Sequence, residues 1–220
     1  RIVGMPGDEV RIQRGKLFVN GEEVHFPEEA FSHLVRLRKA PLADSVWASL
    51  GLPPVPDQAT TLEVPLTATA AATLKQHPQV SAVEAMAMAR GTPRHIFPFS
   101  PYFKWNADDY GPVRVPAAGD TVRLDVTTLP LYDRIISRYE AHQLGHAGDR
   151  LTVDGEATTT YTIEQDHYFV LGDSRHYSAD SRYWGFVPAD HAVGRATVVL
   201  ASRDLDRARL RSGRSFQRLR

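Results

Sequence analysis

The 220-residue sequence contains no cysteine, which excludes a disulfide framework and a thiol nucleophile but is compatible with any compartment. Its 26 basic and 26 acidic residues give a net charge of zero, so the overall charge gives no reason to expect binding to nucleic acid or to acidic substrates. No apolar run approaches the roughly 18 residues needed to span a bilayer, and no signal peptide is visible. Lysine is scarce, since 22 of the 26 basic residues are arginine. The composition allows a sizeable core and indicates neither a nucleic-acid partner nor a cofactor.

The most informative stretch is Gly172–Arg182, which we call the signature loop. It follows an apolar run, Tyr168–Leu171, so we interpret the pair as a strand that ends in a loop of small and charged residues. Two Asp and two Arg lie within these eleven residues, which favours a loop fixed by charge-assisted hydrogen bonds. Composition alone would favour an ordinary polar surface loop.

Alternating and turn-forming residues predict a mainly β protein of the α+β class. Asn20-Gly21, between Lys16–Val19 and Glu22–Val24, predicts a two-residue hairpin. Apolar spacing predicts a helix over Leu129–Leu144. Three further strands are expected: a hairpin of Asp149–Asp154 and Thr158–Ile163 around Gly155, and a buried strand at Arg195–Ser202.

Residues 31–88 differ in sequence pattern from the rest, because helical and strand patterns alternate there. They predict a small inserted α/β lobe whose sheet is covered by two helices. The expected elements are a strand at Ser32–Lys39, a helix at Leu42–Leu50, a strand at Thr61–Leu66, a helix at Thr69–Gln76 and a strand at Val80–Met88. We therefore expect a β core made of residues 1–30 and 89–202, the lobe, and a basic tail at 203–220. The tail contains seven arginines and is interpreted as a solvated segment, with attraction to anionic lipid as the alternative.

Two further features leave alternatives open. The aromatic loop at 97–110 either packs on the core or meets lipid headgroups, where Trp and Tyr are common. His142 and His146 have a spacing that could ligate a metal, but no Glu follows His142 and no third ligand is obvious, so we do not expect a metal site.

The signature loop resembles that of type I signal peptidases, which are membrane-bound Ser/Lys proteases. The resemblance rests on Gly-Asp-Ser-Arg at 172–175, Ser-Ala-Asp-Ser-Arg at 178–182, Gly-Phe-Val-Pro at 185–188, Val-Gly-Arg-Ala at 193–196 and the opening Arg1–Asp8. The chain departs from the family at Ser174, where Asn is usual, and at His176-Tyr177, where Asp-Asn or Asn-Asn is common. These departures leave the local geometry of the loop and a role for Arg175 open.

The resemblance implies a supporting role for six residues. Ser178 would orient a neutral catalytic amine, and Gly172 would leave room beside that amine. Asp180 and Arg182 would form an ion pair that holds the loop, and Asp173 would pair with Arg1. In the family the general-base Lys directly precedes the Arg that corresponds to Arg1, and the nucleophilic Ser lies earlier still. The resemblance therefore implies that both reacting groups and the membrane anchor lie upstream of this chain, so that no catalytic residue lies within it.

The implied function is removal of signal peptides from exported pre-proteins, on the extracytoplasmic (periplasmic) face of the inner membrane. The fold would be an antiparallel β catalytic core of the signal-peptidase type with an inserted α/β lobe. Expected partners are pre-proteins with signal peptides and membrane lipid, through the anchor and the aromatic loop at 97–110, without nucleic acid and without a cofactor. One alternative is a non-catalytic β-module that binds extended peptides or partner proteins. A Ser/Lys self-cleaving repressor domain is a third interpretation, against which the signature loop and the large insert argue.

Overall fold

The structure is a computed structural model that describes residues 1–39, 41–53, 55, 59–89, 95–204, 209–210 and 215–219. It divides into two compact units, Arg1–Ala189 and Asp190–Arg220. Among the described residues strands outnumber helices and the named strands all pair antiparallel, so the predicted mainly β, α+β class is confirmed. The described residues include no helix that is long and apolar enough to cross a membrane.

The elements of the first unit follow in chain order: β1 (Ile2–Gly4), β2 (Glu9–Gln13), β3 (Lys16–Val19), β4 (Glu22–Val24), β5 (Ala30–Leu37), α1 (Asp44–Ser49), β6 (Thr61–Thr67), α2 (Ala68–Lys75), β7 (Val80–Ala85), β8 (Tyr110–Arg114), β9 (Thr121–Arg123), α3 (Leu129–Arg134), a π-helix (Ile135–Tyr139), β10 (Leu144–Ala147), β11 (Arg150–Val153), β12 (Glu156–Ala157), β13 (Thr160–Thr162), β14 (His167–Val170), α4 (Ser181–Trp184) and β15 (Val187–Pro188).

The central sheet has the strand order β4-β3-β2-β8. Val10 and Ile12 of β2 are buried while their neighbours face solvent, which is the alternation of a sheet with one covered face. Asn20-Gly21 forms the predicted turn, because both residues have positive φ (51° and 84°) and the flanking strands pair directly across it. This sheet packs into a buried cluster that also contains Tyr110, Phe169 and Phe186.

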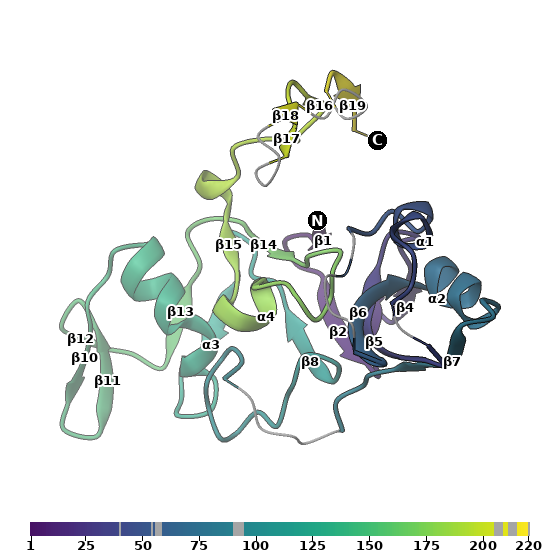
Figure 1. The fold of residues 1–220 in the computed structure, drawn as a ribbon. Coiled ribbons are helices and arrows are strands. Elements are labelled where there is room, and N and C mark those ends of the chain that lie inside the picture. The colour runs from purple at the N-terminus through teal and green to yellow at the C-terminus, as the bar shows by residue number, and fades with distance from the viewer. Residues whose placement is uncertain are drawn as a thin grey trace. The chain divides into compact units, whose positions relative to one another are not determined.

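A second small sheet, β1-β14-β15, joins the two ends of the first unit. Ile2 of β1 lies opposite Val170 of β14 in antiparallel register. Leu171 N–H donates to Arg1 O over 2.9 Å, and the amino group of Arg1 donates to Leu171 O over 2.7 Å. The pairing places the first residue of the chain beside the start of the signature loop (Figure 1).

The lobe consists of a three-stranded sheet, β6-β5-β7, with α1 and α2 packed against it (Figure 1). A hydrophobic cluster of its own holds it together, in which Trp47 of α1 and Leu74 of α2 are almost fully buried. Thr67 caps α2 by accepting a hydrogen bond from Ala70 N–H over 3.2 Å. The element order β-α-β-α-β agrees with the prediction, whereas the domain boundaries at 30/31, 88/89 and 202/203 stay predictions.

The predicted helix at Leu129–Leu144 is wrong at its C-terminal end. The helix α3 passes into a π-helix and ends at Tyr139, and Leu144 already belongs to β10. The backbone leaves helical geometry at Glu140, whose carboxylate accepts hydrogen bonds from the Tyr161 hydroxyl (2.5 Å) and from the backbone N–H of Glu164 (2.9 Å). Ala141 then turns the chain away with a φ of 60°.

Two further strand predictions are corrected by the structure. The turn at Gly155 exists, but Thr160–Thr162 pairs with β9 instead of β11, because the Thr158 side chain and Thr160 backbone form a turn of their own. The segment Arg195–Ser202 is not a buried strand. Its residues 195–198 are exposed, and only Val198–Val199 pairs, as β16, with β19 (Gln217–Arg218).

The small size of the second unit explains why Arg195–Ser202 is not buried. This unit holds β16 and β19, and a separate pair of β17 (Arg203–Asp204) and β18 (Arg209–Leu210). A unit of this size has too little apolar area to build a core, so an apolar run within it remains exposed.

His142 predicts a pH dependence of stability. Its ring contacts two carboxylates, Asp154 at 2.6 Å and Glu164 at 2.8 Å, and hydrogen bonds to both raise its pKa above the usual value of about 6.5. The protonated ring therefore stabilises the fold below about pH 6.5, and this contribution is lost as the pH rises through the raised pKa. We expect the stability difference between the wild type and His142→Gln, measured by urea unfolding, to be larger at pH 5.5 than at pH 9.

The matched control carries Asp154→Asn and Glu164→Gln together, and in that background His142→Gln should have the same effect at both pH values. An equal difference at pH 5.5 and pH 9 in the otherwise wild-type chain would contradict the assignment.

Candidate functional site

The signature loop begins where β14 ends, and a surface ion pair ties it to the first residue. Arg1 Nε donates to Asp173 Oδ1 over 2.6 Å, which is the predicted pairing, and Arg1 also contacts Glu28 at 3.1 Å. The hydrogen bond to Asp173 raises the pKa of Arg1. The Arg1 guanidinium also lies 5.2 Å from the ring centroid of Phe26. These contacts fix Arg1 beside the loop, although they remain largely exposed.

The second predicted pair, Asp180 with Arg182, is buried. Arg182 donates from Nε and Nη2 to the two carboxylate oxygens of Asp180, each over 2.8 Å, and the two side chains are 4% exposed or less. Asp180 also accepts from Gly172 N–H (3.0 Å) and caps α4 by accepting from Arg182 N–H (3.2 Å). Burial alone would raise the pKa of Asp180, but the hydrogen bonds and charge of Arg182 outweigh it and lower the pKa.

The Arg182 guanidinium joins three segments of the chain. Besides Asp180 it donates to Ala107 O over 3.1 Å and to Arg175 O over 2.5 Å. The buried cation is thus paired and hydrogen-bonded, which a charge away from water requires. Its position fixes both arms of the signature loop against the segment that precedes β8.

Gly172 and Ser178 touch directly across the loop. A Cβ added at Gly172 would overlap Ser178 Oγ and lie 2.5 Å from Ser178 Cβ, so the loop closes only because residue 172 has no side chain. The six predicted supporting residues therefore lie in one place, just before β1, just after β14, in the turn before α4 and in the first turn of α4.

The sequence interpretation missed two further contacts of the loop. Arg175 Nη2 pairs with Glu29 at 2.8 Å, and both side chains are 6% exposed or less. His176 Nε2 lies 2.8 Å from Asp108 Oδ1, and its Nδ1 accepts from Ser32 N–H over 3.1 Å. The partners are far apart in sequence, so the available signal was that Arg175, a charged residue within the family motif, had no assigned role.

Asp108 is held by a tight turn in the second half of the aromatic loop. Asn106 Oδ1 accepts from the N–H groups of Asp108 (2.9 Å) and Asp109 (2.8 Å), and Asn106 Nδ2 donates to Ala89 O over 3.0 Å. Met88 N–H donates to Asp108 Oδ2 over 2.7 Å. Burial would raise the pKa of Asp108, but the hydrogen bonds from His176 and Met88 outweigh it and lower the pKa.

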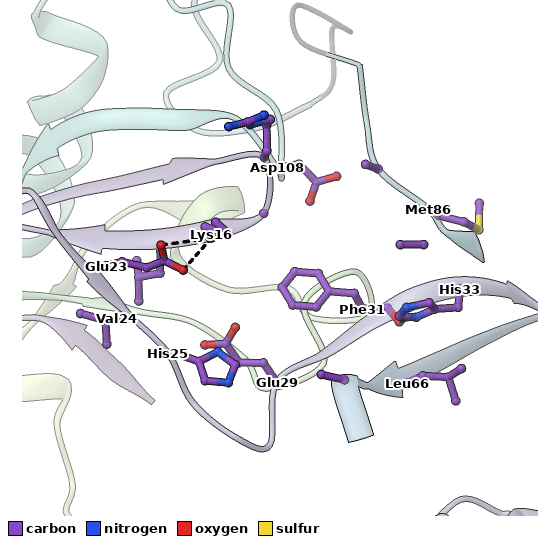
Figure 2. Close-up of a pocket in the computed structure, with 16 residues that line it drawn as sticks. Lys16, Glu23, Val24, His25, Glu29, Phe31, His33, Leu66, Met86 and Asp108 are labelled. Carbon is purple, nitrogen blue, oxygen red and sulfur yellow. Dashed lines mark hydrogen bonds and ion pairs between the residues drawn. The ribbon is translucent and has the colours of Figure 1, made fainter. Parts of the chain in front are cut away.

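A cavity of about 450 Å³ opens between the central sheet and the lobe. Figure 2 shows Phe31 in the middle of its wall, with Leu66 and Met86 on the lobe side and the Lys16–Glu23 ion pair on the other side. Glu29 and Asp108, which hold the signature loop, also line it. Its walls are mainly apolar, which suits a ligand with an apolar body.

The sequence analysis also named the aromatic loop and two histidines as candidates for binding lipid or a metal. In the aromatic loop Phe97 and Tyr110 are buried, so this part packs on the core, whereas Phe99 (62% exposed) and Tyr102 (55% exposed) face solvent, and a contact of these two with lipid stays a prediction. Both ring nitrogens of His142 contact carboxylates, and His146 lies on β10. No group of three or more metal-ligating side chains occurs within the described ranges.

Comparisons with known proteins agree with the motifs. The profile of the family described as "Signal peptidase, peptidase S26" matches residues 114–201, which include the signature loop but not Arg1–Asp8. The chain is 38% identical to signal peptidase I of Haemophilus influenzae over 65 residues (30% of this chain, 19% of the relative). It is 45% identical to signal peptidase I of Aquifex aeolicus over 42 residues (19% of this chain, 16% of the relative).

A probable signal peptidase I-2 of Synechocystis is 56% identical over 36 residues, which is 16% of each chain. The matched part of the chain thus spans about a fifth or less of the length of these relatives. No solved structure matches this chain.

The buried pair predicts a large stability effect at Arg182. Arg182→Ala leaves the Asp180 carboxylate buried without its cation, so we expect the free energy of unfolding to fall by about 3–5 kcal/mol. The control is Arg36→Ala, which breaks an exposed pair with Glu84 at 2.8 Å and should cost at most about 1 kcal/mol. Equal losses in the two variants, measured by urea unfolding, would show that Asp180 does not depend on Arg182.

The contact between Gly172 and Ser178 predicts a coupled pair. Gly172→Ala should destabilise the chain by about 1–3 kcal/mol, because the added methyl group displaces the Ser178 side chain. In a Ser178→Gly background the displaced side chain is absent, so the same Gly172→Ala change should cost less than a third as much. A double-mutant cycle from urea unfolding measures the difference, and strictly additive effects would contradict the contact.

Proposed function

Since this chain belongs to the signal peptidase family, we propose that it is part of a serine endopeptidase that removes signal peptides from exported pre-proteins. The reaction would be amide hydrolysis through an acyl-enzyme, with a neutral Lys amine taking the proton of a nucleophilic Ser. By the family motif the Lys precedes Arg1 directly, and the Ser lies further upstream. In this proposal the 220 residues supply the support of the site and part of its wall.

The pairing of β1 with β14 carries the proposal. Arg1 and Leu171 exchange both backbone hydrogen bonds, so a residue preceding Arg1 in the same register would lie opposite Gly172 as a non-hydrogen-bonded pair. Directly opposite side chains project from the same face of a sheet, with Cβ atoms about 4.5–5.5 Å apart. A Lys at that position would extend over Gly172, beside the Ser178 hydroxyl that occupies the same space. That hydroxyl could then orient the amine, and burial of the amine in the complete protein would lower its pKa.

The remaining parts of the proposal follow the family. The substrate would lie extended and add to a strand edge, where main-chain hydrogen bonds supply affinity. The enzyme would act on the extracytoplasmic side of the inner membrane, with an anchor elsewhere in the protein. Phe99 and Tyr102 support a contact between the aromatic loop and lipid headgroups, because both are more than half exposed.

The test uses the complete protein and a signal-peptide substrate. We expect a Lys directly before Arg1, and its replacement by Met should lower kcat by about 1000-fold or more, because the nucleophile loses its base. Ser178→Ala should lower kcat by about 10-fold or more, while Ser49→Ala, a serine at the end of α1, should leave it unchanged. The 220-residue chain alone should show no turnover.

A residue other than Lys before Arg1, or full activity of the Met variant, would refute the proposal. Binding of the substrate without cleavage by the complete protein would instead support the alternative of a peptide-binding β-module.

A further inference from the structure

The signature loop is docked on the lobe. Ala30 N–H donates to Asp173 O over 2.9 Å, and Arg175 N–H donates to Ala30 O over 2.8 Å, so Ala30 and Ser174 form a parallel bridge. The β5–β7 pairing starts only at His33. The loop thus occupies the edge of β5 that lies beyond the end of β7, and it adds an isolated parallel bridge to the lobe sheet.

Two side-chain contacts fix this docking at its ends. The first is the Arg175–Glu29 pair, whose members are both buried. Burial lowers the pKa of Arg175 although Glu29 opposes the shift, so this carboxylate offsets part of the cost of removing the guanidinium from water. Glu29 is itself oriented, because it accepts from Phe26 N–H over 3.0 Å. A loss of Glu29 would leave a cation buried in the middle of the signature loop.

The second contact is His176 with Asp108. Ser32 N–H donates to His176 Nδ1, so that nitrogen carries no proton and the Nε2–H group donates to Asp108. The ring also packs edge-on against Phe31, with centroids 5.7 Å apart. The imidazole therefore connects β5, the signature loop and the turn at Asn106–Asp109, at a position where the resembled family commonly has Asp or Asn.

Both contacts continue to the buried Asp180–Arg182 pair. Arg182 donates to the carbonyl of Arg175, the partner of Glu29, and to the carbonyl of Ala107, the neighbour of Asp108. A shift at either carboxylate must therefore move an acceptor of Arg182. Arg182 in turn holds Asp180, which accepts from the N–H of Gly172 beneath Ser178.

We propose that Glu29 and Asp108 are positioning residues, which together with strand β5 of the lobe set the geometry of the signature loop and of Ser178. The proposal rests on the proposed function for its catalytic consequence, whereas the docking itself does not. It gives the lobe a role in the reaction in place of a merely peripheral insertion. Glu29 and Asp108 also line the cavity of Figure 2, so the same two side chains contact both the signature loop and that cavity.

The experiment compares Glu29→Gln and Asp108→Asn with Glu23→Gln in the complete protein. Glu23 lines the same cavity but pairs only with the exposed Lys16 among its described ion-pair partners, so it is the matched control. We expect kcat for a signal-peptide substrate to fall about 10- to 100-fold in the first two variants with KM changed less than twofold, because a displaced loop misplaces the reacting groups. Glu23→Gln should keep the wild-type kcat.

Amide hydrogen exchange supplies a readout that does not need activity. Exchange at the N–H groups of Ala30, Ser32 and Arg175 should speed up at least about tenfold in the first two variants and not in Glu23→Gln. If Glu29→Gln does not fold, the pair Glu29→Met with Arg175→Met removes the same contact without leaving a buried charge.

Unchanged exchange in folded Glu29→Gln and Asp108→Asn would overturn the docking, and faster exchange with wild-type kcat would overturn the positioning role. A complete wild-type protein that cleaves nothing, with exchange altered as expected, would refute the proposed function and leave the docking supported.

Discussion

The buried pair of Asp180 and Arg182 is the interaction on which the site depends. A guanidinium that is 1% exposed is tolerated because four of its five N–H groups meet acceptors, namely two carboxylate oxygens and two backbone carbonyls. The carbonyls belong to chain segments before β8 and in the middle of the signature loop. One side chain therefore determines how three segments meet, and the contact between Gly172 and Ser178 follows from that arrangement.

The lobe contributes backbone hydrogen bonds to this arrangement. Over the first residues of its central strand β5, the backbone groups on the side of β7 have no partner in β7. Such groups at a sheet edge can pair with another segment of chain. The signature loop fills part of that edge with one parallel bridge, and Glu29 and Asp108 hold its side chains. The signature loop is thus joined to the lobe sheet, while the strand that leads into it, β14, belongs to the small sheet with β1.

The sequence predicted local features well and long-range partners poorly. The Asn20-Gly21 turn, the alternation of β2 and the order of elements in the lobe follow from periodicity and turn chemistry, which are local properties. The family motif led to the two Asp–Arg pairs. Nothing local showed that Thr160–Thr162 pairs with β9, that Glu140 ends the helix, or that Arg175 meets Glu29, because each depends on a partner distant in sequence.

The use of arginine instead of lysine at three positions of this site has a physical reason. Arg1, Arg175 and Arg182 each act through a planar group that contacts a carboxylate, and Arg182 reaches two carbonyls besides. An ammonium group presents its donors from a single point and is more strongly hydrated, so it could neither span these acceptors nor be buried at the same cost. Support of the site therefore calls for arginine, and the proposed mechanism needs lysine only where a neutral amine must accept a proton.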